Sequence, residues 1–175
     1  MRIPLRGTPD DWFAWLSSGQ TEQRDEAKLI LGGLVPEDPV APETLMAQLQ
    51  NPSTDIVFWA VIALDRLERR AAPALPALRQ LATSHPAFGV RDAAIAALSR
   101  IASADPVSKQ AFLYALGDES AWVRASALRA FINVPDLADT DLAAIRALAQ
   151  DPESMVVHQV EITLRNIRLR TGPAA

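Results

Sequence analysis

Apolar residues recur along the chain in a constant register. The segments 51–67, 85–101, 118–134 and 151–167 each have an apolar anchor followed by apolar residues four, eight and eleven positions later. The quartets are Ile56/Ala60/Leu64/Leu67, Val90/Ala94/Leu98/Ile101, Val123/Ala127/Phe131/Val134 and Val156/Val160/Leu164/Ile167. These offsets place every quartet on one face of a helix with 3.6 residues per turn. The pattern therefore predicts four equivalent amphipathic helices.

The spacing of the anchors indicates an internal repeat. The anchors are separated by 34, 33 and 33 residues, and a further step of 33 towards the N-terminus reaches Gln23. Ala27, Leu31 and Leu34 follow Gln23 at the same offsets. A polar anchor suits a terminal repeat, which has one face towards water. We therefore expect five repeats.

A second, shorter amphipathic helix is predicted before each of these helices. The ranges are 9–18, 42–50, 73–83, 106–116 and 139–149. Thr8-Pro9, Asp105-Pro106 and Asp151-Pro152 each place a capping residue before a proline suited to a first helical turn. Glycines at 19, 32, 33, 117 and 172 stand where helices are expected to end. We expect an all-α fold of ten helices in five antiparallel pairs, as a single domain over 1–175 with repeats at about 9–34, 42–69, 73–102, 106–134 and 139–170.

The longer helices carry a family resemblance. Their pattern Asp-x-x-x-x-Val-Arg-x-x-Ala-x-x-x-Leu/Phe-x-x-Ile/Val resembles the second helix of a HEAT repeat, best at 90–101 and 118–134. The short period is similar to that of bacterial HEAT repeats of the phycobilisome-lyase type. The resemblance covers about 9–170 and implies a right-handed α-solenoid, with the shorter helices on the convex side and the longer ones on the concave side. It implies a binding scaffold but no particular partner.

Polar residues at repeat positions have a structural and a functional interpretation. Arg91 and Arg124, which follow their anchors, are candidate ligand-binding cations. We interpret them as structural, bonded to an Asp or to helix-terminal carbonyls of a neighbouring repeat. The equivalent positions in the second and fifth repeats hold Val57 and Val157, so a series of such arginine contacts from repeat to repeat would be interrupted there. We interpret the turn residues as caps of the helices that follow them, at Asn51, His85, Asp118 and Asp151.

Composition excludes several kinds of chemistry. The chain has no cysteine and two histidines, which excludes thiolate nucleophiles, disulfides and cysteine-based metal sites. His158 and Glu161 share a helix face but lack a third ligand nearby, so we interpret them as a surface pair. No phosphate loop or Ser-His-Asp set is present. We predict no catalytic residue, no metal and no cofactor, and therefore no enzymatic activity.

Charge and hydropathy bear on partners and location. Lys and Arg number 17 against 21 Asp and Glu, a net charge of −4, whereas duplex-DNA binders usually carry the opposite balance. Pro4, Arg6 and Asp10 interrupt the N-terminal region, which therefore lacks the continuous apolar core of a signal peptide. No apolar run approaches the roughly 18 residues that would cross a bilayer. We expect a cytoplasmic, monomeric protein that does not bind a membrane.

Phe58, Trp59 and Ile62 are an anomaly, because other repeats have small or polar residues at these offsets. They form either a contact site or a patch covered by the preceding repeat or by the Pro-rich stretch 35–42. Trp122 precedes an anchor, and we expect it to pack between repeats.

The predicted partner-binding face follows from the positions of the long helices that point away from the core. It comprises Phe58, Trp59, Ile62, Arg66, Asp92, Arg100, Arg129, Asn133, His158 and Arg165. Such a face, aromatic at its centre and charged at its ends, suits a protein or peptide partner. We predict an interaction scaffold centred on Phe58 and Trp59 and assisted by Arg129. Two alternatives remain open: a HEAT-like DNA alkyl-base glycosylase or DNA-binding module, and an immunity- or chaperone-type protein that neutralises or escorts one partner.

Overall fold

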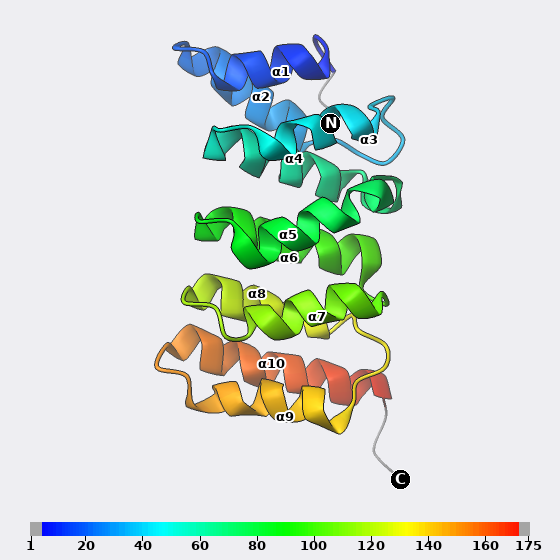
Figure 1. The fold of residues 1–175 in the computed structure, drawn as a ribbon, viewed down its shortest axis with the longest axis vertical. Coiled ribbons are helices and arrows are strands. Elements are labelled where there is room, and N and C mark those ends of the chain that lie inside the picture. Colours follow the sequence, from blue (N-terminus) through cyan, green and yellow to red (C-terminus); the bar gives the residue numbers. More distant parts are fainter. Residues whose placement is uncertain (1–4, 172–175) are drawn as a thin grey trace.

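The protein is a stack of helical hairpins (Figure 1). The computed structural model describes residues 5–171, so residues 1–4 and 172–175, with Gly172, lie outside it. The α-helices are α1 Pro9–Leu16, α2 Thr21–Gly32, α3 Pro42–Met46, α4 Thr54–Arg66, α5 Leu75–Ser84, α6 Phe88–Ala102, α7 Pro106–Ala115, α8 Ala121–Phe131, α9 Asp139–Ala147 and α10 Ser154–Thr171. Short 3₁₀ segments occupy Ala47–Gln50, Glu68–Ala74 and Leu148–Gln150. Within 5–171 there is no strand, and the all-α prediction of ten helices in five pairs is confirmed.

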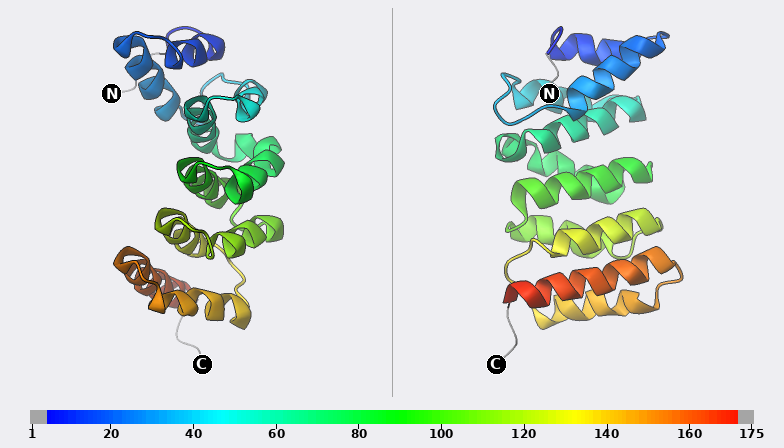
Figure 2. Two further views of the ribbon diagram at one scale, coloured as in Figure 1. Left: turned by 60° about the vertical axis from the view of Figure 1, so that its left-hand side comes forward. Right: turned by 180° about the vertical axis from the view of Figure 1, so that it is seen from behind.

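The hairpins form two layers. The first helices of the pairs (α1, α3, α5, α7 and α9) make one layer, and the second helices (α2, α4, α6, α8 and α10) make the other. Figure 2 shows the two ends of the second layer displaced towards the same side, so the stack is curved. The second helices line the concave side, as predicted. No helix within the described residues is both long and apolar enough to cross a membrane.

The core follows the predicted quartets. Every quartet member on α4, α6 and α8 is buried, whereas Leu164 on α10 is only partly buried. In the first repeat Gln23 is partly exposed and its partners Ala27 and Leu31 are fully buried. Phe112 of α7 and Phe131 of α8 meet edge to face, with ring centroids 6.1 Å apart. The same stripe of each second helix therefore packs into one continuous core.

Helix boundaries depart from expectation mainly between α4 and α5. Glu68 has a φ of 49°, a left-handed conformation directly after Leu67, the C-terminal capping residue of α4. A 3₁₀ segment containing Pro73 follows, so α5 begins at Leu75 instead of residue 73. Pro73 alone would suit a first helical turn, but Pro76 would be the fourth residue of a helix that begins at 73, and it has no N–H for the first α-helical hydrogen bond. Thr8 and Asp105 cap α1 and α7 as predicted.

Candidate partner-binding face

The turns before the second helices share one arrangement. Asn51, His85, Asp118 and Asp151 each accept a hydrogen bond from the backbone N–H two residues later, at 3.0, 3.1, 2.8 and 2.9 Å. The helices begin at residues 54, 88, 121 and 154, so these side chains bond the N–H of the residue before the first helical turn. The prediction that they cap the helices themselves was wrong, because they lie too far from the helical amides. They shape the turn that leads into the helix.

Arg91 and Arg124 connect successive repeats. Arg91 Nε and Nη2 donate to the two carboxylate oxygens of Asp118 at 2.8 and 2.9 Å, and Arg124 does the same to Asp151 at 2.7 and 2.8 Å. Each Nη1 donates to two backbone carbonyls of the turn before its own helix. The bond from Arg124 lowers the pKa of Asp151, although burial acts in the opposite direction. The structural interpretation of both arginines is confirmed.

We call the successive arginine–aspartate pairs the ladder. It does not extend to the interface between the second and third repeats, where both the arginine and the aspartate are replaced. Val57, which replaces the arginine on α4, is buried. The residue at the acceptor position of the next repeat is His85, not an aspartate. A valine in place of the arginine would have left a buried aspartate without its cation, at a high energetic cost. At the interface between the second and third repeats both residues of the ion pair are therefore replaced, so neither position leaves a buried carboxylate without its cation.

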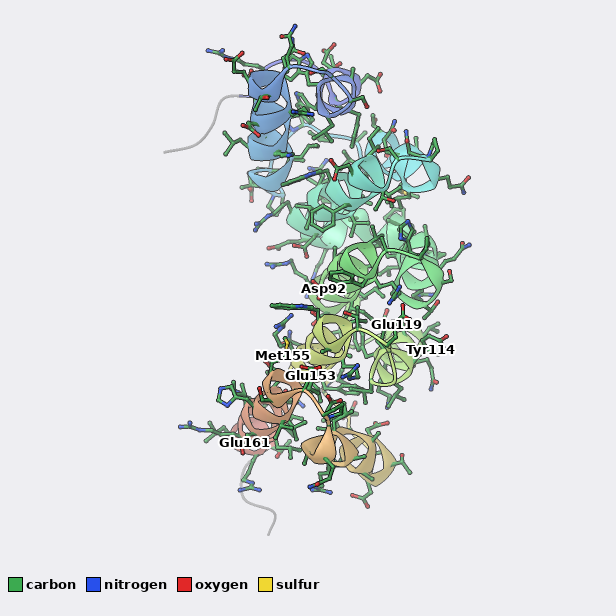
Figure 3. The ribbon with its side chains drawn as sticks, turned by 90° about the vertical axis from the view of Figure 1, so that its left-hand side faces the viewer. Asp92, Tyr114, Glu119, Glu153, Met155 and Glu161 are labelled. Carbon is green, nitrogen blue, oxygen red and sulfur yellow. The ribbon has the colours of Figure 1, made fainter. Side chains whose placement is uncertain are left out.

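One stripe of each second helix lies on the concave side. Its positions are one before the anchor and three, six and ten after it, which share a helix face. We call these residues the concave stripe: Asp55, Trp59, Ile62 and Arg66 on α4; Gly89, Ala93, Ala96 and Arg100 on α6; Trp122, Ser126 and Arg129 on α8, with Asn133 just after it; Met155, Gln159, Ile162 and Asn166 on α10. Figure 3 shows Met155 on this side, together with Asp92, and Tyr114 on the opposite side.

The aromatic pair on α4 is partly covered by the preceding repeat. Phe58 and Trp59 meet at right angles with ring centroids 5.6 Å apart, and both rings are partly buried against the core. A Cβ at Gly32 of α2 would lie 3.4 Å from the Trp59 ring, so α2 approaches this ring closely. Ile62 is likewise partly buried. Phe58, Trp59 and Ile62, the predicted centre of the face, are therefore packed partly against the core and remain partly exposed.

The Pro-rich loop is fixed at the end of α4. Arg70 donates to the backbone carbonyls of Pro36, Asp38 and Val40 at 2.6, 2.6 and 2.8 Å. Arg70 lies in the 3₁₀ segment that follows α4, which places the loop against the C-terminal end of this helix. One arginine thus satisfies three carbonyls of a loop that has little secondary structure of its own.

A hollow of about 300 Å³ lies between α6 and α8 on the concave side. It is lined by Ala96, Ser99, Arg100, Ser126, Arg129, Ala130 and Asn133. Three of the predicted partner-binding residues, Arg100, Arg129 and Asn133, therefore come together in one place. Small side chains from both helices (Ala96, Ser99, Ser126 and Ala130) leave this space open between Arg100 and Arg129.

Polar contacts between neighbouring second helices hold Arg100 and Arg129 in position beside this hollow. Arg100 Nε donates to Asp65 of α4 at 2.8 Å, and Arg129 Nη2 lies 3.8 Å from Asp92 of α6. Buried Ser126 donates to Asp92 and accepts from Arg129. The side chains of Arg100 and Arg129 both remain 51% exposed. Asp92 is thus part of the wall that positions Arg129.

The remaining predicted residues, on α4 and α10, are not brought together with the hollow. Arg66 and Arg165 are exposed, and among residues 5–171 no hydrogen bond or ion pair engages either guanidinium. His158 Nδ1 lies 4.0 Å from Glu161 on the surface of α10. In the part of the chain that the structure describes, no group of three or more His, Asp or Glu is placed to hold a metal ion.

Trp122 is the main residue that sequence reasoning misplaced. We expected it to pack between repeats, but it is 56% exposed, so that prediction was wrong. It lies seven residues before Arg129 on α8, two helical turns away on the same face. Leu29 and Ile162, at the offset of Ile62, are also exposed. The register of the repeat contained this information, because the offsets of Trp122 (one before its anchor) and of Trp59 (three after its anchor) both belong to the concave stripe.

Comparisons with known proteins agree with this architecture. A solved complex of CpcE and CpcF of phycocyanin lyase from Nostoc sp. PCC7120 has a TM-score of 0.72 at 19% identity, over 89% of this chain and 97% of that chain. A designed armadillo repeat protein in complex with the peptide (KR)4 gives 0.62 at 18% identity, over 89% and 80%. An engineered protein gives 0.61 at 20% identity, over 91% and 78%. At these identities the likeness establishes the fold alone.

Sequence comparison gives the family. No curated protein matches the chain. The family model for HEAT repeats matches residues 42–132, slightly more than half of the sequence. The chain belongs to the HEAT repeat family.

Proposed function

We propose that this protein is a non-catalytic interaction scaffold that binds a protein or peptide segment across the concave face of its second helices. It acts as a cytoplasmic monomer, and its partner contacts the predicted face from α4 to α10. The observation that carries the proposal is the arrangement around α6. Trp59 and Trp122 stand on the two helices that flank it, and the hollow with Arg100 and Arg129 lies between α6 and α8.

The chemistry of this surface favours a polypeptide. Tryptophan and arginine are the residues most often responsible for binding energy at protein interfaces. Trp122 keeps more than half of its surface exposed although it lies beside a hollowed region of a helical stack. Trp122 lies two helical turns from the half-exposed guanidinium of Arg129 on the same face, so the face offers one partner segment both an apolar contact and directional hydrogen bonds. A partner that covers Trp122 would remove its apolar surface from water.

The comparisons support the proposal at the level of architecture. The designed armadillo protein of similar fold was solved with a bound peptide, and the phycocyanin lyase chains were solved as a complex of two proteins. Stacked helical hairpins are thus able to present an extended surface to another chain.

Selection from a random peptide display library on the immobilised protein tests the proposal. Peptides that bind wild-type protein are then titrated against Trp122→Ala and against Tyr114→Ala. Tyr114 is the matched control, because it is an aromatic residue 64% exposed on α7 of the outer layer. We expect Trp122→Ala to weaken binding about tenfold or more and Tyr114→Ala to leave it unchanged. Binding that depends on Tyr114 and not on Trp122 would place the site on the outer layer and overturn the proposal.

A further inference from the structure

Building on the proposed function, we infer that the concave face takes an acidic peptide in extended conformation, whose carboxylates pair with the arginine band. The arginine band is defined as Arg66, Arg100, Arg129 and Arg165, one exposed arginine on each of α4, α6, α8 and α10. Carboxylate is the ligand that the planar guanidinium fork matches best among peptide side chains.

The concave side is divided into two zones of charge. The carboxylates Asp25, Asp55 and Asp92 belong to the N-terminal halves of their helices, whereas Asp65, near the C-terminal end of α4, is paired with Arg100. Arg66 and Arg100, at equivalent positions, belong to the C-terminal ends of α4 and α6. This segregation follows the helix dipole, which favours anions at helix N-termini and cations at C-termini. All second helices run in the same direction. Arg129 lies four positions earlier in its repeat than Arg66 and Arg100 in theirs, and Arg165 one position earlier, so the four cations span about one helical turn.

The band retains hydrogen-bond donors for an incoming carboxylate. Arg100 donates a hydrogen bond from Nε to Asp65, and among the described residues its two terminal nitrogens donate to no acceptor. Arg129 uses Nη2 for Ser126, and its remaining donors are uncommitted in the same way. A guanidinium has five N–H donors, so neither residue is saturated by its internal partner. Asp65 and Asp92 therefore hold the two arginines in place without occupying them.

The spacing of the repeats suits an extended chain. Packed helices lie roughly 8–10 Å apart, and an extended or polyproline-type segment advances about 9–10 Å in three residues. A peptide that crosses α4, α6 and α8 would bring an acidic residue to Arg66 and another, about three positions later, to Arg100.

A single-stranded nucleic acid is the other polyanion that an arginine band could meet. The net charge of −4 opposes either polyanion, but Asp92, on the concave side, opposes a nucleic acid more, because a nucleic acid carries a phosphate at every nucleotide whereas a peptide can place its carboxylates at the arginines alone. Phosphate tracking needs a surface on which cations are not interrupted by carboxylates. The experiment below includes this probe.

Fluorescence anisotropy with four labelled probes tests the inference. The probes are the peptides (Glu-Leu-Pro)₄, (Lys-Leu-Pro)₄ and (Gln-Leu-Pro)₄, in which proline keeps the chain extended, and a single-stranded oligonucleotide. The proteins are wild type, Arg66→Gln, Arg100→Gln, Arg146→Gln and Trp122→Ala. Arg66 has no partner within residues 5–171, so its loss leaves no carboxylate unpaired, and Arg146 is an exposed arginine of α9 in the outer layer.

We expect the glutamate peptide to bind at least about tenfold more tightly than the lysine and glutamine peptides and than the oligonucleotide. Arg66→Gln and Arg100→Gln are each expected to weaken this binding severalfold, added salt to weaken it further, and Arg146→Gln to change nothing. Equal affinity for the three peptides, equal loss with Arg146→Gln, or tighter binding of the oligonucleotide would overturn the inference. If the glutamine peptide binds as tightly and loses affinity in Trp122→Ala, the proposed scaffold function stands and the acidic partner is wrong.

Discussion

Arg124 and Asp151 form a two-pronged ion pair between α8 and the turn that begins the last repeat, with N–O distances of 2.7 and 2.8 Å. The side chains are nearly buried, at 11% and 4% exposure. The same pair recurs one repeat earlier between Arg91 and Asp118. These pairs fix the register of successive hairpins, because the same arginines also bond the turn before their own helix.

The chain itself suggests how to test this ladder. Arg91→Val is expected to lower the free energy of unfolding by about 3–5 kcal/mol, because it leaves Asp118 buried without its cation. The double variant Arg91→Val/Asp118→His reproduces the combination found at Val57 and His85, and we expect it to recover a substantial part of the loss. Urea unfolding measures both. If the double variant is as unstable as the sum of the two single variants, the two positions are not coupled.

The ladder also predicts a dependence of stability on pH. The hydrogen bond from Arg124 lowers the pKa of Asp151 in the folded protein, so the folded state holds fewer protons than the unfolded chain below about pH 4. The stabilisation is complete above the unfolded pKa and is lost as the pH falls through the folded pKa. We expect the difference in unfolding free energy between wild type and Asp151→Asn to be constant near neutral pH and to narrow below about pH 4. A difference that stays constant through the acid range would contradict this account.

Glu68 offers a test of backbone strain at the junction of α4 and the following 3₁₀ segment. Its φ of 49° is a conformation that glycine adopts without a steric penalty. Glu68→Gly is expected to raise the unfolding free energy by about 0.5–1 kcal/mol, and Glu68→Ala, which removes the charge but keeps the Cβ, is expected not to. Thermal unfolding of the two variants measures this, and a higher midpoint for Glu68→Gly than for Glu68→Ala is the expected result. A larger gain for alanine would assign the effect to the carboxylate.

Trp59 and Trp122 are expected to differ when each is replaced by alanine. Trp59 is half-buried against Gly32 and the core, so its loss is expected to cost about 1–3 kcal/mol of stability as well as affinity for a partner. Trp122 is 56% exposed, and its loss is expected to reduce affinity with little change in the thermal midpoint. Unchanged stability in Trp59→Ala would show that its packing against α2 contributes little.

Sequence periodicity was sufficient for the fold and for the inward-facing residues, since a core on one side of every second helix imposes the same offsets on each repeat. Periodicity also identified Arg91 and Arg124 as structural. It could not tell how far a neighbouring helix covers a residue that points away from the core. Trp59, Trp122 and Ser126 all lie on the concave stripe, yet they are half-buried, exposed and buried respectively. Coverage depends on the adjacent repeat: Gly32 has no side chain, so the backbone of α2 comes close to Trp59, and Asp92 accepts a hydrogen bond from Ser126.

The binding face that is central to this account can be observed through the tryptophan indole N–H signals in a ¹⁵N–¹H correlation spectrum, recorded while a peptide selected by display is added. Trp59 and Trp122 lie on the concave stripe, and Trp12 is an internal control, because it is buried in α1 with its indole N–H bonded to the Arg6 carbonyl at 2.5 Å. The account predicts that the signals of Trp59 and Trp122 shift with the peptide concentration and that the Trp12 signal does not. Saturable binding that leaves both Trp59 and Trp122 unshifted would contradict it.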